Sequence, residues 1–114
     1  MSREVGLYLE DILGAIDKVT AYVSGKTLQD LQRDTLLLDA VAFNLIVVGE
    51  AAGKVPPEIR SVYPEVPWSQ VVGLRNIIAH EYFGLDLDII WDVVQNELPI
   101  LQQVVEKIQK IEKE

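Results

Sequence analysis

The most apolar part of the chain is DTLLLDAVAFNLIVVGEAAGK, residues 34–54. Apolar side chains would occupy almost every face of a helix built from this segment, which is typical of a helix at the centre of a bundle or shared with a second subunit. Its longest apolar run, Leu36 to Gly49, contains Asp39 and Asn44 and is shorter than the ~20 residues that a membrane-spanning helix needs. We therefore expect a buried core helix and no membrane segment.

The segment before this helix has the three- and four-residue apolar spacing of an amphipathic helix. Residues 2–23 are predicted to form it, with Ser2 as N-cap, and Gly25 is suited to the left-handed conformation that ends a helix. Thr27 and Asp30 have the spacing of a capping box. We expect one long helix to run from this box to about residue 54.

The C-terminal half predicts two further helices, separated from the first two by an irregular connection. Four of the five prolines fall within residues 56–67, where they prevent a regular helix. A helix is expected to begin at Pro67 and to fray near His80. Asp86 is placed to cap a last helix, in which Pro99 should produce a kink. The predicted fold class is all-α, an antiparallel bundle of four main helices with short extra turns.

Length and composition limit the classes of function. With 114 residues, the chain fits a single domain over residues 1–114. Without cysteine it can form neither a disulfide nor a thiolate metal site, and one histidine argues against zinc. The first residues show no uninterrupted apolar run of signal-peptide type, so we expect a cytoplasmic protein without metal or cofactor. Ten Lys and Arg against 18 Asp and Glu give a net charge of −8, so nucleic acid could bind only at a local basic pocket.

The reactive side chains gather in RNIIAHEY, residues 75–82. The guanidinium of Arg75 can bind a phosphate, His80 can carry a proton near neutral pH, and the hydroxyl of Tyr82 can be modified. In a straight helix Arg75 and His80 would point about 140° apart. We therefore expect the helix to end near Ala79 and His80 to lie just beyond it, where Glu81 and the helix dipole favour a positive charge on the imidazole.

Two interpretations of these residues stay open on residue types alone. Metal-free RNA cleavage needs a base, a cation and an acid, and a two-fold dimer would bring two copies of His80 and Arg75 into one cleft. Alternatively, His80 only caps a helix end and Arg75 only forms a salt bridge. Asp39 and Glu50, about three turns apart on one side of the central helix, either pair with Arg or Lys at a partly wet seam, or Glu50 orients a catalytic group.

The pattern formed by Arg75, His80 and Tyr82, Arg-x4-His-x-Tyr, resembles the signature of the HEPN superfamily, in its branch of small HepT-like toxins. The similarity covers most of the chain in order, through the segments IVVGEAA (46–52), YPEVPW (63–68), LRN (74–76), YFGLD (82–86) and from IW (90–91) to LP (98–99).

This resemblance implies a homodimeric, metal-independent endoribonuclease that cleaves RNA by attack of the ribose 2′-hydroxyl, the toxin of a toxin–antitoxin pair. It implies that Arg75 and His80 are catalytic and that Asn76 assists in positioning, with Glu50 and Glu81 as supporting candidates. The implied partner is a nucleotidyltransferase antitoxin that silences the toxin by transferring AMP to Tyr82. The alternative is a non-catalytic helical subunit that binds substrate or nucleotide for such a partner.

Overall fold

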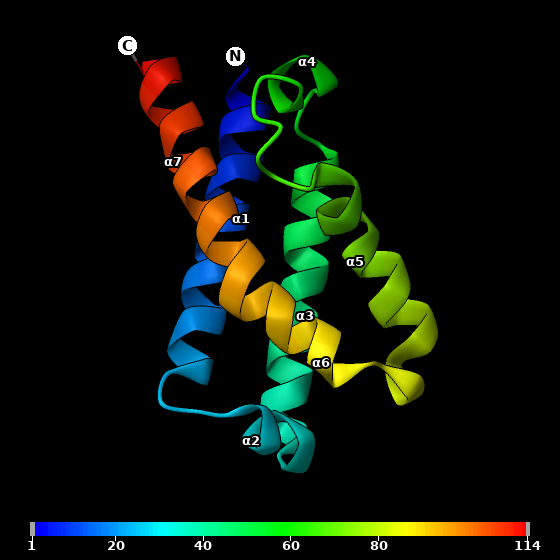
Figure 1. Ribbon diagram of the computed structural model, residues 1–114. Coiled ribbons are helices and arrows are strands. Elements are labelled where there is room, and N and C mark those ends of the chain that lie inside the picture. The colour runs from blue at the N-terminus through cyan, green and yellow to red at the C-terminus, as the bar shows by residue number, and fades with distance from the viewer. Residues whose placement is uncertain (1, 114) are drawn as a thin grey trace.

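The computed structural model describes residues 2–113, which form helices joined by turns and loops, with no strand among them (Figure 1). This confirms the all-α prediction and divides the chain more finely than four main helices. The elements are α1 (Arg3–Val23), α2 (Leu28–Arg33), α3 (Thr35–Gly53), α4 (Pro57–Arg60), α5 (Trp68–Glu81), the 3-10 turn η1 (Tyr82–Gly84), α6 (Leu87–Asp92), the π-helical segment η2 (Val93–Glu97) and α7 (Leu98–Lys113).

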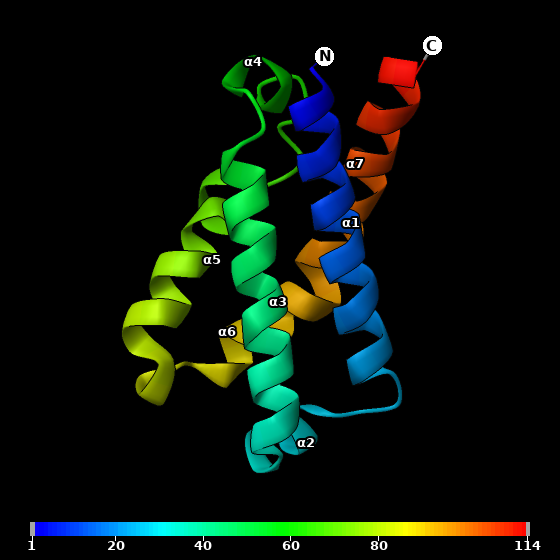
Figure 2. The same cartoon turned by 180° about the vertical axis from the view of Figure 1, so that it is seen from behind.

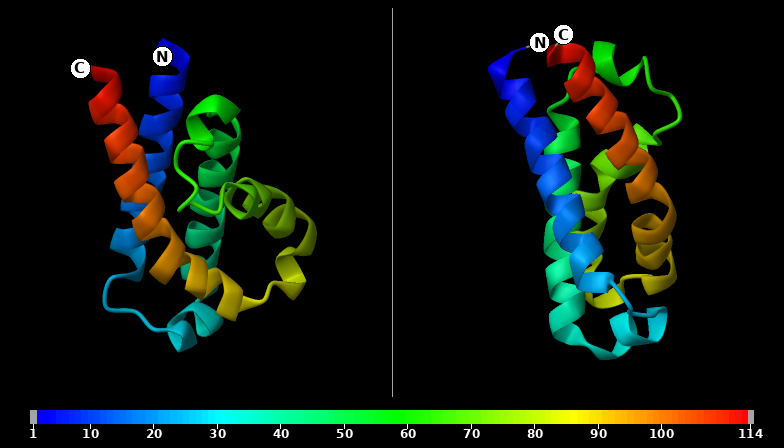
Figure 3. Two further views of the ribbon diagram at one scale, coloured as in Figure 1. Left: turned by 45° about the horizontal axis from the view of Figure 1, so that its top comes forward. Right: turned by 90° about the vertical axis from the view of Figure 1, so that its left-hand side faces the viewer.

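The apolar helix α3 lies at the centre, between α1 and α5, and α7 packs against α1 (Figures 1 and 2). By length and composition α3 could cross a membrane, but half of its most apolar 18-residue stretch is buried within the fold. Its buried apolar side chains are those of Leu37, Val41, Ala42, Leu45, Val48, Ala51 and Ala52. The predicted core position of this helix is confirmed. Figure 3 shows that the first and last helices run to the same end of the molecule.

Local sequence signals placed the first helix correctly. The side chain of Ser2 accepts a hydrogen bond from the backbone N–H of Val5, and Gly25 has a positive φ of 74° just beyond α1. Thr27 and Asp30 form the complete capping box of α2, each side chain accepting from the other residue's backbone N–H. The hydrogen bond from that N–H of Thr27, followed by the one from its hydroxyl, holds the pKa of Asp30 below its ordinary value.

The prediction of a single helix from the capping box to residue 54 is wrong, because the helix is interrupted at Asp34. Asp34 adopts an extended conformation, with φ −106° and ψ 98°. Its side chain accepts a hydrogen bond of 3.1 Å from the backbone N–H of Leu37 and so caps α3. An aspartate favours such a cap because its carboxylate satisfies a backbone donor that has no partner within the helix. The short helix α2 therefore turns away and packs against α6.

The prediction that α5 ends near Ala79 is also wrong. α5 continues through His80 to Glu81, and the chain then tightens into η1. The physical reason is that no helix-breaking residue follows Ala79 until Gly84. His80 therefore belongs to the last helical turn.

The last helical region contains the predicted interruption. Asp86 caps α6 as expected, accepting from the backbone N–H groups of Asp88 and Ile89. The π-helical segment η2 ends directly before Leu98, whose N–H bonds to the carbonyl of Val93, five residues back. Since Pro99 has no N–H, the regular ladder cannot continue through this point, and a π-turn accommodates the missing bond. Pro99 thus changes the helix type just before it.

Candidate active site

A close approach between α3 and α5 sets the geometry of the candidate site. At Gly49 an added Cβ atom would lie 3.0 Å from the carbonyl oxygen of Val71 and 3.2 Å from the backbone nitrogen of Arg75. A Cβ at these distances would require the neighbouring backbone to shift by a few tenths of an ångström, so glycine at this position lets the two backbones pack at this spacing. The following residue, Glu50, is thereby brought level with Arg75.

Arg75 and Glu50 form an ion pair across this interface. Arg75 Nε lies 2.5 Å from Glu50 Oε1, and the two side chains are 56% and 48% exposed. The prediction that Glu50 pairs with a basic residue is confirmed, and its partner is Arg75. A half-exposed pair adds little stability, so its main effect is on the orientation of the guanidinium. The contact uses Nε, and the guanidinium has further N–H donors that can bind an oxyanion.

The ion pair lies beside a surface hollow of about 250 Å³. The residues that line it are Gly49, Glu50, Gly53, Lys54, Val72, Arg75 and Asn76. Lys54 is a second cation at this hollow, which the sequence argument missed. The available signal was its position four residues after Glu50, which places both on one side of α3.

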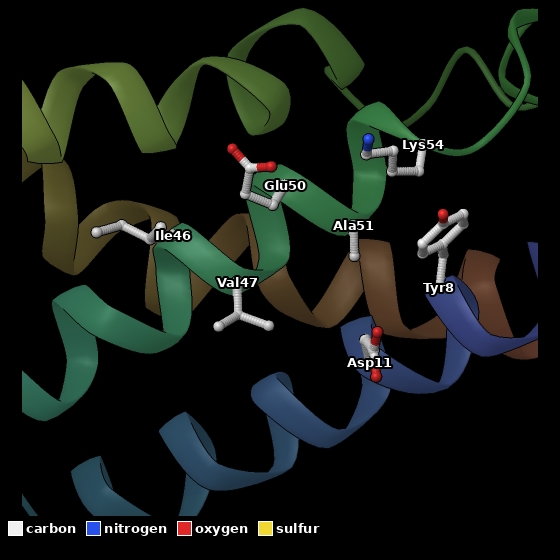
Figure 4. A pocket seen from close by; sticks show the side chains of 7 residues that line it. All are labelled: Tyr8, Asp11, Ile46, Val47, Glu50, Ala51 and Lys54. Carbon is white, nitrogen blue, oxygen red and sulfur yellow. The ribbon is translucent and has the colours of Figure 1, made fainter.

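A second hollow, of about 290 Å³, lies between α1 and α3, and Glu50 and Lys54 line it as well. Figure 4 shows Val47 and Ala51 pointing toward α1 and Glu50 on the opposite side of α3, toward α5. Tyr8 and Asp11 of α1 complete the lining. Glu50 therefore stands between an apolar groove and the hollow that contains Arg75.

Tyr82, the last residue of the sequence motif, is tied to α3. Its hydroxyl donates a hydrogen bond to Asp39 Oδ1. This hydrogen bond, followed by desolvation and by the negative charge of Asp39, raises the pKa of Tyr82 above its ordinary value of 10.0. Asp39 thus pairs with a phenol and not with the cation that the sequence argument considered. The ring of Tyr82 also stands edge to face with that of Phe83, with centroids 5.4 Å apart.

His80 lies apart from the Arg75 hollow in the single chain. Both residues are in α5, five positions apart, so their side chains leave the helix about 140° apart. Asn76 lines the hollow and precedes His80 by four residues, so it shares a side of the helix with the histidine. His80 and Glu81 are exposed. One chain therefore brings together Glu50, Arg75 and Asn76, and the exposed imidazole of His80 is not among the groups that line the hollow.

Large apolar side chains are exposed around these groups. Ile77 and Phe83 flank His80 along the chain, and Leu36 and Phe43 lie on α3 within one turn of Asp39. Exposed apolar groups that surround a polar site are typical of a surface that another molecule covers. Across residues 2–113, no group of three or more His, Cys, Asp or Glu side chains gathers in the manner of a metal site.

The family described as Ribonuclease HepT-like has a profile that matches residues 12–108. The chain belongs to this family. HepT-like proteins are a branch of the HEPN superfamily, so the resemblance seen in the sequence is confirmed. No solved structure matches the chain.

Curated relatives carry ribonuclease names. The chain is 32% identical over 110 residues, 96% of its length and 100% of the relative's, to a protein of Thermococcus cleftensis named as a probable ribonuclease HepT. It is 36% identical over 106 residues to a protein of Caldanaerobacter subterraneus subsp. tengcongensis provisionally named an RNase, covering 93% of the chain and 95% of the relative.

A protein of Methanocaldococcus jannaschii, named as a gamma-glutamylcyclotransferase and provisionally as an RNase, is 35% identical over 108 residues. The match covers 95% of the chain and 49% of that relative, so this HepT-like chain spans about half of its length. The family and the relatives' names together support a ribonuclease role for the chain.

Proposed function

We propose that this protein is a metal-independent endoribonuclease, the toxin of a toxin–antitoxin pair. The observation that carries the proposal is the hollow in which Arg75 and Asn76 lie side by side, with Glu50 holding the guanidinium, in a member of the Ribonuclease HepT-like family. Arg75 binds the phosphate to be cleaved, Asn76 positions it and His80 transfers protons. Glu81, next to His80, is the supporting carboxylate.

Cleavage needs two proton-transfer groups and a cation at one phosphate. The base removes the proton of the ribose 2′-hydroxyl, whose oxygen then forms a bond to phosphorus. The bond from phosphorus to the 5′-oxygen breaks, and that oxygen takes a proton from the acid. The products are a 2′,3′-cyclic phosphate and a 5′-hydroxyl, and Arg75 stabilises the charge of the crowded phosphorus between these steps.

A homodimer would complete this set of groups. One chain carries a single histidine, which is exposed on the side of α5 away from Arg75. A two-fold axis near α5 would place His80 of each copy close to the other, so that one acts as base and the other as acid. The exposed apolar side chains Ile77, Phe83, Leu36 and Phe43 support such an interface.

Local charge reconciles RNA binding with the acidic composition. The net charge of −8 repels an RNA backbone at long range. Arg75 and Lys54, against the one carboxylate of Glu50, leave a net positive charge at one hollow, which would attract a single phosphate there. This arrangement favours cleavage that depends on few phosphate contacts over tight binding along an extended stretch of RNA.

We further propose that a nucleotidyltransferase antitoxin silences the protein by transferring AMP to Tyr82. A phosphodiester on Tyr82 would add negative charge and bulk two residues from His80, which would repel an RNA backbone. The partly exposed position of Tyr82 is compatible with access by a second protein.

The second candidate function is a non-catalytic subunit that binds substrate or nucleotide for a partner nucleotidyltransferase. The acidic net charge favours it, because a general RNA-cutting enzyme gains from a positive surface. In this alternative Arg75 and Lys54 would hold the phosphate of a nucleotide.

Expression of the chain with and without its proposed nucleotidyltransferase partner separates the two functions. The toxin hypothesis predicts growth arrest and RNA damage from the chain alone, and recovery on co-expression together with an added AMP on the Tyr82 peptide. The subunit hypothesis predicts a stable complex of the two proteins, no arrest and intact RNA. The His80→Ala variant is the control, since it should abolish arrest only if the chain is the nuclease.

A further inference from the structure

The contact between Asp39 and Tyr82 lies outside the hollow and takes no part in the proposed cleavage. It joins α3 to η1 across 43 positions of sequence, so the packing of α5 on α3 is needed to form it. Asp39 is exposed and Tyr82 is only partly buried, so a second protein can reach both. The carboxylate of Asp39 accepts a hydrogen bond from the phenol oxygen of Tyr82, the atom to which AMP would be attached.

We propose that Asp39 is the proton acceptor and positioning group for nucleotidyl transfer to Tyr82. This inference rests on the proposed silencing of the protein by AMP transfer, and it assigns part of the chemistry of that transfer to the acceptor protein itself. Asp39 touches the reacting oxygen, so it acts directly on the bond that forms.

The transfer balances with a nucleoside triphosphate as the second reactant. The hydroxyl oxygen of Tyr82 attacks the α-phosphorus of ATP, and its proton moves to the carboxylate of Asp39. The bond between the α-phosphorus and the oxygen of the leaving pyrophosphate breaks, and the pyrophosphate takes the electron pair. The product is a phosphodiester on Tyr82, and Asp39 later releases its proton to water.

General-base help is needed because the phenol is neutral near neutral pH. Its pKa is raised by the hydrogen bond to Asp39, so a preformed phenolate is scarce. An aspartate that accepts a hydroxyl proton during attack on phosphorus is an established device in phosphoryl transfer. From α3 the charged group that faces Tyr82 is Asp39, and the titratable neighbours on its own segment are His80 and Glu81.

The same contact would report that the transfer has occurred. Once the oxygen of Tyr82 is esterified, it has no proton to donate to Asp39, and the new phosphodiester carries the same sign of charge as the carboxylate. The hydrogen bond between η1 and α3 is then lost.

The test measures the rate of AMP attachment to the purified full chain by the proposed nucleotidyltransferase partner, with ATP and Mg²⁺. Four variants are compared with the wild type: Asp39→Asn, Asp39→Glu, Tyr82→Phe as the blank, and Glu10→Gln as a matched loss of one exposed carboxylate from α1. Asp39→Asn keeps an acceptor oxygen at the same place and removes its basicity. Circular dichroism establishes that each variant keeps its helices.

The inference predicts a roughly 100-fold slower transfer to Asp39→Asn at neutral pH, since general bases contribute at least this much. Its rate should rise about tenfold per pH unit toward the pKa of the phenol, while the wild-type rate stays nearly flat. Asp39→Glu should recover most of the rate, and Glu10→Gln should match the wild type.

Two outcomes would overturn the inference, and they are distinguishable. If the wild type is modified and Asp39→Asn is modified within twofold as fast, with the same pH profile, Asp39 is not the proton acceptor while the proposed silencing stands. If the wild type accepts no AMP at all, the silencing itself is wrong and the inference falls with it.

Discussion

Glu50 of α3 and Arg75 of α5 form an ion pair, with Oε1 2.5 Å from Nε, beside Gly49, where the backbones of the two helices pack tightly. The pair joins the apolar central helix to the helix that carries the sequence motif. Because both side chains are about half exposed, their contact matters more for the direction of the guanidinium than for the stability of the fold.

The Glu50→Gln variant tests this orienting role. The free energy of unfolding should change by less than about 1 kcal/mol, because exposed ion pairs contribute little. The kcat for RNA cleavage should fall roughly tenfold with little change in KM, since the bound phosphate meets a misdirected arginine. Urea unfolding and steady-state kinetics on a fluorogenic RNA measure the two effects. An unchanged kcat would show that Glu50 does not position Arg75.

The Gly49→Ala variant tests the close approach of α3 and α5. The added methyl group would meet the carbonyl oxygen of Val71 at 3.0 Å, and neither backbone can yield without moving a helix. We expect a loss of about 1–3 kcal/mol in the free energy of unfolding, the usual cost of overpacking.

Gly14→Ala in α1 is the matched control, because a Cβ there has no neighbour within 4 Å. That variant should gain up to about 1 kcal/mol from the better helix propensity of alanine. Urea denaturation of both variants provides the comparison. Equal effects of the two substitutions would contradict the proposed packing.

The pKa of the Tyr82 hydroxyl should lie above its ordinary value of 10.0, because the neutral hydroxyl donates a hydrogen bond to the carboxylate of Asp39. A raised pKa in the folded state means that the neutral phenol stabilises the fold. This contribution is fully present below pH 10 and disappears as the pH rises through the raised value.

Ultraviolet titration of tyrosinate, taken as the difference between the wild type and Tyr82→Phe, isolates this group among the four tyrosines. In Asp39→Asn the pKa of Tyr82 should move down toward its ordinary value. A Tyr82 pKa at or below 10 in the wild type would mean that the hydrogen bond does not form in solution.

The cap at Asp34 predicts the effect of its removal. Asp34→Ala should lower the free energy of unfolding by about 1 kcal/mol, the usual cost of losing an N-cap, and Asp34→Asn should restore most of it. Thermal unfolding of the three proteins measures both changes. If α2 and α3 were one continuous helix, alanine at this position would instead stabilise the protein through its helix propensity.

Local signals in the sequence predicted most helix boundaries, because each depends on residues a few positions apart. Ser2, the Thr27 box and Asp86 have their hydrogen-bond partners within four residues, and the signal of Gly25 is its own positive φ. The helix boundary at Asp34 is not evident from the local pattern, because the apolar pattern continues on both sides of it. Its choice between helix interior and cap depends on how α2 packs against α6, which no local pattern encodes.

The sequence indicates candidate residues for the site but not their arrangement in space. The residue types of Arg75, His80 and Tyr82, together with the resemblance to the family signature, point to the site, and that resemblance alone implies a role for Asn76. Helical periodicity places Asp39 and Glu50 on one side of α3. Which partner each carboxylate takes depends on the crossing of α3 and α5, a tertiary feature. α5 extends past its predicted end near Ala79, because the angular separation of Arg75 and His80 does not by itself require the helix to stop. The structure keeps the helix and leaves the two apart.

Arg75 and His80 are proposed to cleave RNA without a metal ion, and an assay of the purified protein in excess EDTA tests this proposal. We expect fragments that end in a 2′,3′-cyclic phosphate from the wild type, and none from His80→Ala or Arg75→Ala. Cleavage that EDTA abolishes, or cleavage that both variants retain, would contradict it.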